Sequence, residues 1–254
     1  MTFNTKTLLA AAALLAVTAA QAASVTVASG TGNYKGMTLS GSDTLSFSAD
    51  LLGALDTSKI ALSPYGSALG NVTKDADGYY LTGEAAAPAT SYVIDSTSNR
   101  VLMGYSTGGQ TQTGPALKSV STGGVLTVTD LYADRTTKQM FGTIIGGNGV
   151  GTVSNVLIWN IASITGDTAI TAPGTYTATY SGLSITADAY SLFSRSLGLL
   201  KLGNSALSGI TDYGTITSTL IATAVTTPSV PEPSTYVLMG LGLVGLSLAA
   251  RRRT

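Results

Sequence analysis

The chain has 254 residues, no cysteine and no histidine, and its 13 basic and 13 acidic residues give a formal net charge of zero. These absences exclude a disulfide framework, a thiol nucleophile, a histidine general base and a Cys/His zinc site. Hydrophobic residues make up 44% of the chain and charged residues only 10%, so it can bury a core. Abundant Thr, Tyr, Ser and Gly predict strands joined by turns, in an exported all-β protein.

The first 22 residues have the pattern of a secretory signal peptide. Lys6 provides the positive start, Leu8 to Ala20 form an apolar or small stretch, and Ala20-Gln21-Ala22 is a cleavage site of the A-x-A type. The apolar stretch is shorter than the roughly 20 residues that a spanning helix needs. We therefore expect export through the Sec translocon and cleavage by signal peptidase between Ala22 and Ala23.

Residues 23–226 alternate between apolar and polar side chains. This pattern predicts strands within 24–29, 44–49, 78–85, 125–134 and 175–186, and a more continuously apolar central strand within 152–162. Turn-forming clusters separate these segments. The predicted fold class is all-β and mainly antiparallel, a sandwich-like or otherwise β-rich single domain.

Two segments favour short helices instead. In residues 187–203, the side chains of Leu192, Phe193, Leu197 and Leu200 recur near helical spacing, with Gly203 as the expected stop. A second short helix is expected within 48–56.

Two hairpins have similar sequences, "YVIDSTSNRVLM" (92–103) and "LYADRTTKQMFG" (131–142). In each, an aspartate ends a strand and a threonine follows in the turn, so we expect Asp95 and Asp134 to cap turn amides. The glycine-rich "GGNGVG" (146–151) leads into a strand rather than a helix, which favours a hairpin turn over a phosphate-binding loop.

The spacing of Thr73, Asp75, Asp77, Gly78 and Glu84 resembles that of a calcium-binding loop. However, Thr replaces the first acidic ligand, and the residues that follow alternate like a strand. Asp75, Asp77 and Glu84 are therefore a weak calcium candidate, and a hairpin turn is the main interpretation. No other metal ligands, cofactor-binding residues or catalytic residues are assigned.

Other candidate chemistry is limited. Asp130 and Asp134, on one predicted strand face, would lie about 13 Å apart, beyond the roughly 5–9.5 Å that glycosidases use. Tyr176 and Tyr180 share one face, whereas Tyr79 and Tyr80 lie on opposite faces. Tyrosine rings can stack on sugars, but sheets also pack them routinely.

The C-terminal end has three parts. Residues 227–235 form a proline-rich linker that contains Pro231, Glu232 and Pro233. Residues 236–250 are uncharged and predict a transmembrane helix about 22 Å long, short of the roughly 30 Å hydrocarbon core. Arg251, Arg252 and Arg253 follow directly, in the tail 251–254, and should remain in the cytoplasm.

This order of parts resembles the PEP-CTERM sorting signal of Gram-negative bacteria. The resemblance covers about the last 25 residues, together with the N-terminal signal peptide. It implies that an exosortase-type enzyme processes the tail, and that the protein is held briefly in the inner membrane before it reaches the cell surface or the outside. A plain C-terminal anchor is the alternative.

The resemblance also implies an association with exopolysaccharide and biofilm. Together with the composition, it favours a non-enzymatic surface or extracellular-matrix protein that needs no cofactor. Residues 23–230 carry nine basic and twelve acidic side chains, so they do not favour nucleic-acid binding. Two alternatives stay open: a carbohydrate-binding module for the cell's own polysaccharide, and a hydrolase with an acidic site.

Overall fold

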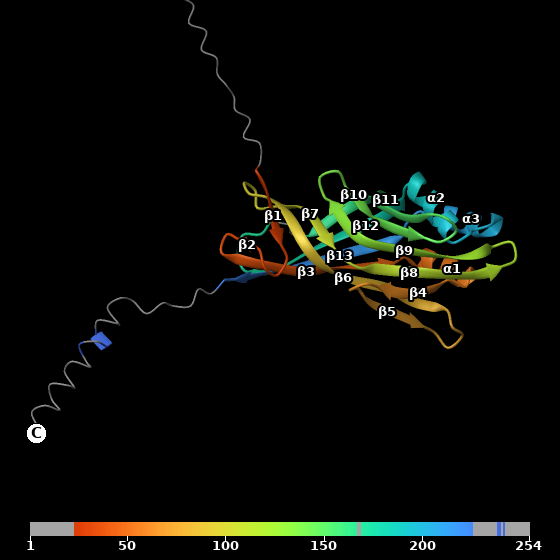
Figure 1. The fold of residues 1–254 in the computed structure, drawn as a ribbon, viewed down its shortest axis with the longest axis horizontal. Coiled ribbons are helices and arrows are strands. Elements are labelled where there is room, and N and C mark those ends of the chain that lie inside the picture. The colour runs from red at the N-terminus through yellow and green to blue at the C-terminus, as the bar shows by residue number, and fades with distance from the viewer. Residues whose placement is uncertain (1–22, 167–168, 226–237, 240, 242–254) are drawn as a thin grey trace, which may run out of the picture. The chain divides into compact units, whose positions relative to one another are not determined.

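The computed structural model describes residues 23–166, 169–225, 238, 239 and 241 (Figure 1). Contacts divide the chain into two units, 1–223 and 224–254. The predicted signal peptide, the proline-rich linker and nearly all of the predicted transmembrane helix lie outside the described residues. Within the described ranges, no helix is long and apolar enough to cross a membrane.

The first unit is built on one antiparallel sheet that closes on itself (Figure 1). The closure depends on a short strand, β7, which pairs with both β6 and β9. Going round the ring, the order is β6, β3, β13, β12, β11, β10, β9 and β7. These strands are β3 (Met37–Phe47), β6 (Tyr80–Asp95), β7 (Val101–Ser106), β9 (Ser121–Asp134), β10 (Gln139–Gly146), β11 (Gly151–Gly166), β12 (Gly174–Ile185) and β13 (Gly214–Ala224).

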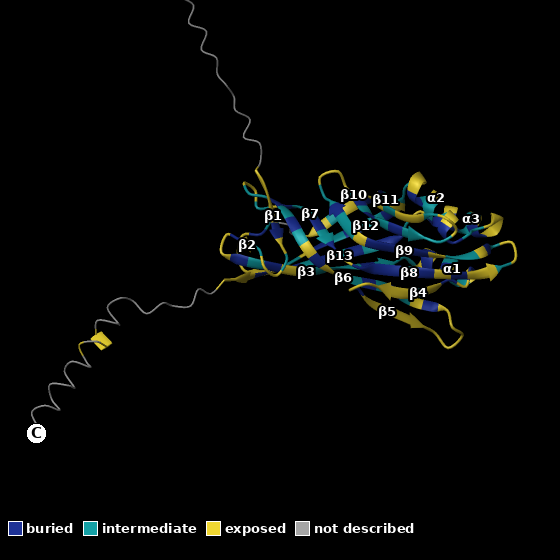
Figure 2. Cartoon of the chain, viewed as in Figure 1, coloured by how far each residue is buried: buried dark blue, intermediate teal, exposed yellow. Residues whose placement is uncertain are grey.

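Five further strands extend this ring. β1 (Ser24–Ala28) pairs with the end of β6, and β2 (Asn33–Tyr34) pairs with β3. β8 (Gly109–Leu117) pairs with the first part of β9. β4 (Ala61–Tyr65) pairs with β8, and β5 (Leu69–Lys74) pairs with β6, so the hairpin β4–β5 reaches from one strand to the other. This hairpin is the most exposed part of the sheet (Figure 2).

Each of the six predicted strand segments overlaps a strand, although the segment 44–49 ends in the first residue of a helix, Ala49. The two similar hairpins are also confirmed. Asp95 Oδ1 accepts a hydrogen bond from the Thr97 amide (2.9 Å), and Asp134 Oδ1 accepts one from the Thr136 amide (2.8 Å). Residues 147–150 form the predicted turn between β10 and β11.

Three helices occur in the described residues, where the sequence predicts one or two. α1 (Ala49–Thr57) begins as expected, because the Ser48 hydroxyl accepts a hydrogen bond from the Leu51 amide (3.1 Å). The expected single helix over 187–203 is wrong. It is divided into α2 (Ala187–Ser196) and α3 (Lys201–Ser208), because Gly198 adopts a left-handed φ of 61°. Gly203, the expected stop, therefore lies inside α3.

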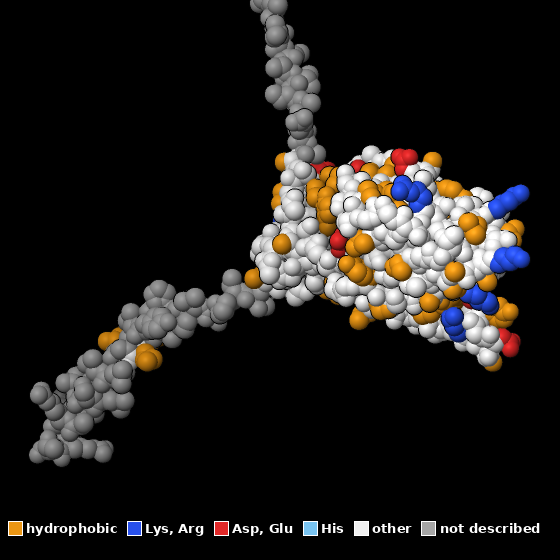
Figure 3. Space-filling view, turned by 45° about the vertical axis from the view of Figure 1, so that its right-hand side comes forward, with side chains coloured by type: hydrophobic (Ala, Val, Ile, Leu, Met, Phe, Trp, Pro, Cys, Tyr) orange, Lys and Arg blue, Asp and Glu red, His pale blue; other side chains and the backbone are white. Residues whose placement is uncertain are grey.

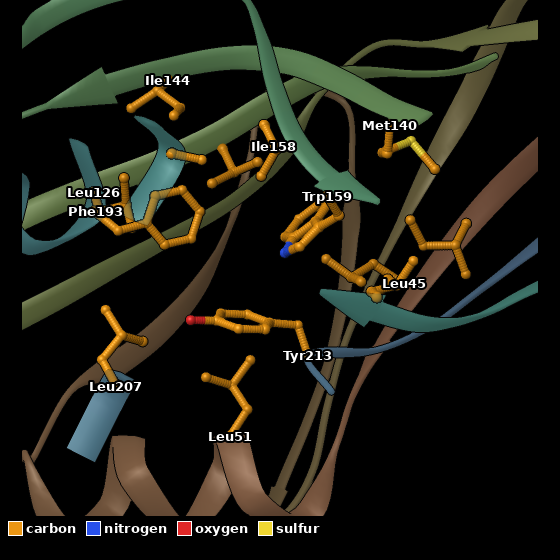
Figure 4. Close-up of a cluster of buried hydrophobic side chains, with 14 of the residues drawn as sticks. Leu45, Leu51, Leu126, Met140, Ile144, Ile158, Trp159, Phe193, Leu207 and Tyr213 are labelled. Atoms are coloured by element: carbon orange, nitrogen blue, oxygen red, sulfur yellow. The ribbon is translucent and has the colours of Figure 1, made fainter. Parts of the chain in front are cut away.

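Inward-facing side chains form two hydrophobic clusters. The first lies beneath the helices and includes Trp159, Tyr213 and Phe193 (Figure 4). The rings of Trp159 and Tyr213 pack at a tilt, with centroids 6.5 Å apart. The second cluster includes Leu39, Ile94, Ile170 and Leu220, toward the β1–β2 end of the sheet. The alternation of apolar and polar residues along the strands thus places one hydrophobic cluster on each side of the middle of the ring.

We expect Asp134→Ala to destabilise the fold by about 1 kcal/mol at pH 7, because it removes acceptors that hold the β9–β10 turn. Although burial raises the pKa of Asp134, hydrogen bonds from Thr136 and Thr137 hold it below its ordinary value. The stabilisation is therefore present above the ordinary carboxyl pKa and is lost as the pH falls through the lowered pKa. Urea midpoints at pH 7 and in acid check this. Asp77→Ala, in an exposed turn, is the control, and a pH-independent difference would contradict the assignment.

Candidate functional site

A carboxylate points into the ring between the two hydrophobic clusters. Asp43 lies on β3, an even number of residues from Leu39 and Leu45, so all three side chains are on the same face of the strand. Leu39 belongs to the second hydrophobic cluster and Leu45 to the first. On the paired strand β13, Ser218 is buried between Ile216 and Leu220 in the same way. Polar groups therefore occupy the level of the ring at which the two cores meet.

Three more side chains complete this polar cluster, which we define as Asp43, Tyr92, Arg135, Tyr180 and Ser218. Arg135, in the β9–β10 turn, donates a hydrogen bond from Nε to the Tyr180 hydroxyl (2.7 Å). Ser218 hydrogen-bonds to both Asp43 and Tyr180. Tyr92 is 2% exposed, and its hydroxyl has no hydrogen-bond partner among the described residues.

A glycine makes this approach of strands possible. A side chain at Gly41, on β3, would collide with the Thr219 carbonyl and with the Tyr92 hydroxyl. Gly41 therefore leaves room for the phenol of Tyr92 beside Asp43.

The cluster shifts the acidity of its own members. Burial raises the pKa of Asp43, and the hydrogen bond from Ser218 and the positive charge of Arg135 oppose this without cancelling it. Burial also raises the pKa of Tyr92 and Tyr180, and the charge of Asp43 raises both further. The interior thus favours the neutral forms of all three groups.

A cavity adjoins the cluster, and both Asp43 and Tyr180 line it. It comprises about 520 Å³ of space between atoms, including a part open to solvent, of which about 20 Å³ is accessible to water. That is room for about one water molecule. Its wall is rich in small side chains, which are Ala85, Ala87, Gly104, Ser106, Gly108, Gly109 and Ala133.

The cluster contains one carboxylate, whereas a glycosidase site uses two at about 5–9.5 Å. With hydroxyls and one carboxylate as acceptors, the arrangement is suited to hydrogen bonding or to holding a cationic group.

The calcium candidates are not brought together. Asp75 Oδ1 accepts hydrogen bonds from the amides of Asp77 (3.0 Å) and Tyr79 (2.9 Å), which forms the turn between β5 and β6. Glu84 lies within β6 and accepts hydrogen bonds from Ser46 and Asn71. In the described ranges, no group of three or more His, Cys, Asp or Glu residues could hold a metal ion.

The other acidic candidates also have local roles. Asp130 adopts a φ of 52° where the register of β9 and β10 shifts, and Oδ1 accepts hydrogen bonds from the amide of Gly108 and the hydroxyl of Thr107. Asp134 caps its turn. The bulge interrupts the simple alternation on which their predicted shared strand face depended.

Tyr80 and Tyr180 pack within the sheet, whereas Tyr79 is 52% exposed and has Lys59 Nζ 5.5 Å from its ring centroid. Tyr180 is buried, and the hydroxyl of Tyr176 holds residues 171 and 172. On the ring, Tyr105, Tyr132 and Phe141 stack on one another with centroids 4.9 and 5.0 Å apart. This stacking covers ring faces that a sugar would need.

The sequence analysis missed the polar cluster. One signal was available: in "LSGSDTL" (39–45), Asp43 falls at an alternate position with Leu39 and Leu45, which a strand places on its inward face. Of the residues assigned to sorting, Ala23 is described, whereas Ala22, Pro231 to Pro233 and Arg251 to Arg253 lie outside the described residues.

We expect Asp43→Asn to stabilise the protein at neutral pH. A raised pKa in the folded state means that folding binds a proton, so stability falls as the pH rises from the ordinary carboxyl pKa through the raised one. Asn cannot ionise, so the variant keeps the free energy of unfolding that wild type loses as Asp43 ionises. Tm should rise by about 2–4 °C for each kcal/mol of this free energy. Thermal unfolding at pH 7 and pH 3 tests this. The gain should disappear at pH 3, and a variant less stable than wild type at pH 7 would contradict it.

Comparison with known proteins adds two similarities. The structure is similar to that of the heme binding protein HtaB from Corynebacterium glutamicum, with 13% identity and a TM-score of 0.44 over 79% of this chain and 98% of that chain. A similarity of this size supports no conclusion about function. No curated protein matches the chain. Residues 229–253 match the PEP-CTERM protein-sorting motif, so the chain carries this sorting signal at its C-terminal end.

Proposed function

We propose that the chain is a surface or extracellular-matrix protein, exported through the Sec translocon and processed by an exosortase-type enzyme. In this proposal the β-rich body acts without catalysis, next to exopolysaccharide in a biofilm. The observation that carries the proposal is the sorting motif at residues 229–253.

The body's surface supports a role outside the cell. Ser and Thr occupy outward positions along neighbouring strands, including Thr177 and Thr179 on β12 and their partners Thr219 and Thr217 on β13. Figure 3 shows few charged side chains on the face in view, with most basic ones toward one end. A hydroxyl-rich surface with more acidic than basic side chains suits a hydrated matrix and gives no electrostatic attraction to nucleic acid.

In this proposal, each part of the C-terminal tail has a separate role in sorting. Three arginines oppose passage across the membrane, because moving their charges through hydrocarbon is costly. The segment 236–250 is short, so the anchor is marginal and suited to temporary use. Glu232, framed by Pro231 and Pro233, would be the element that the processing enzyme reads.

We expect Glu232→Gln to leave membrane insertion intact but to block processing, since it removes the charge while keeping the size. In the native host, the variant should accumulate as a full-length membrane form while wild type is shortened and released. Immunoblots of membrane and medium fractions measure this.

Replacement of Arg251, Arg252 and Arg253 by Gln is the matched comparison and should disturb retention and topology instead. If both variants were processed and released like wild type, the tail would be a passive anchor and the proposal would be wrong.

The N-terminal end gives a separate prediction. The exported protein should begin at Ala23, because signal peptidase cleaves after Ala-Gln-Ala. N-terminal sequencing of the released form measures this, and a released form that begins at Met1 or Thr2 would contradict export by signal-peptide cleavage.

A further inference from the structure

We propose that the cavity inside the closed sheet binds a small primary amine, with its ammonium group against Asp43 and its apolar part along the cavity wall. This site is separate from the sorting signal, and the inference does not depend on the proposed function.

The polar cluster can accept hydrogen bonds beyond those from Ser218 and Arg135, because a carboxylate has about four lone-pair sites. An ammonium group has three N–H donors and no acceptor. The carboxylate of Asp43 lines the cavity, and the buried Tyr92 hydroxyl, which has no hydrogen-bond partner among the described residues, lies close to it. Tyr180 also lines the cavity, and its hydroxyl interacts with both Arg135 and Ser218.

The positive charge of Arg135 compensates the buried carboxylate of Asp43 only partly. Arg135 directs Nε to Tyr180, and its charge lowers the pKa of Asp43 less than burial raises it. The titratable groups that act on Asp43 or respond to it are Tyr92 on β6, Arg135 in the β9–β10 turn and Tyr180 on β12. A ligand ammonium would supply the compensating charge that the protein only partly provides.

The rest of the cavity wall consists of apolar residues, and several of them are small. Leu45, Val128, Met140 and Ile216 line the cavity together with its Ala and Gly residues. A Cβ atom added at Gly104 would meet only Tyr92 Cδ1, at 3.8 Å. Interior positions of small closed sheets are normally filled by side chains, so small residues at these positions leave space for an apolar group.

The β4–β5 hairpin covers this region. Its tip packs on Gly108, since a side chain at Gly108 would collide with backbone atoms of Tyr65, Ser67 and Ala68. Ser67 also donates a hydrogen bond to the Thr107 carbonyl (2.9 Å). Another cavity, with about 240 Å³ of space between atoms that includes a part open to solvent, is lined by Leu62, Pro64 and Val72 of the hairpin and shares Ala85 and Gln110 with the first.

Outward movement of the tip would uncover Gly108, which lines the first cavity. The closed cavity has room for about one water molecule, so a ligand larger than water requires this movement. The hairpin is suited to it, because it is exposed along both strands.

The test compares n-butylamine with 1-butanol, which has a similar shape but no charge, by calorimetric titration of the full-length chain in mild detergent. We expect the amine to bind about tenfold more tightly at pH 8, the size of effect expected for a hydrogen bond to a charged group. Because the amine stays protonated while Asp43 ionises as the pH rises, the preference should shrink toward pH 4. The affinity for 1-butanol should not change.

Three variants separate the site from general effects. Asp43→Asn should remove the preference for the amine, and Gly104→Val should abolish binding of both ligands by filling the cavity. Thr44→Val, on the outward face of β3, is the control and should bind like wild type. Thermal unfolding of each variant shows that it folds.

Absence of binding by the wild-type chain would overturn the site. Equal affinity for amine and alcohol, or a preference unchanged in Asp43→Asn, would overturn the assignment of the ammonium to Asp43. Binding retained by Gly104→Val would place the ligand elsewhere. Because the chain is full length and unprocessed, none of these results depends on whether the sorting proposal holds.

Discussion

The pairing of β7 with both β6 and β9 is the constraint on which the rest of the structure depends. A six-residue strand turns an open antiparallel sheet into a closed one. Closure sets the direction in which every side chain of the ring points, because residues on a strand alternate between the inside and the outside. It also removes sheet edges that would otherwise pair with other chains. Among the described strands, the remaining edges lie on β1, β2, β4 and β5, and β4 contains Pro64.

Closure of the sheet places the Asp43 carboxylate in an unfavourable environment. The strand that carries Leu39 and Leu45 into the two cores also carries a carboxylate into the space between them. Burying a charge without full compensation is costly, and the raised pKa of Asp43 expresses that cost. Tyr180, Ser218 and Arg135 reduce the cost, but the hydroxyl of Tyr92 and the cavity beside it leave the arrangement incomplete. Positions at which a sequence departs from its own pattern are often functional sites.

The sorting motif and the candidate site occupy different parts of the chain. The sorting motif occupies residues 229–253, whereas the polar cluster, the cavity and its cover all lie between Asp43 and Ser218. A body with acids in turns, stacked tyrosines and one interior carboxylate gives little support to glycoside cleavage by a pair of acids. We propose that it persists outside the cell, with a small site that can be altered without affecting sorting.

Local patterns in the sequence determined a large part of this protein. The sorting motif depends on an order of short segments, and the alternating strands, the caps at Asp95 and Asp134 and the start of α1 depend on residues a few positions apart. The break at Gly198 was missed because helical spacing continued across it while its left-handed φ ended the helix. Only the tertiary structure decided that β7 closes the sheet, and that Asp43, Tyr92, Arg135, Tyr180 and Ser218 meet inside it. These residues come from distant strands, and alternation along one strand gives the side on which a residue lies but not the residues that face it across the ring.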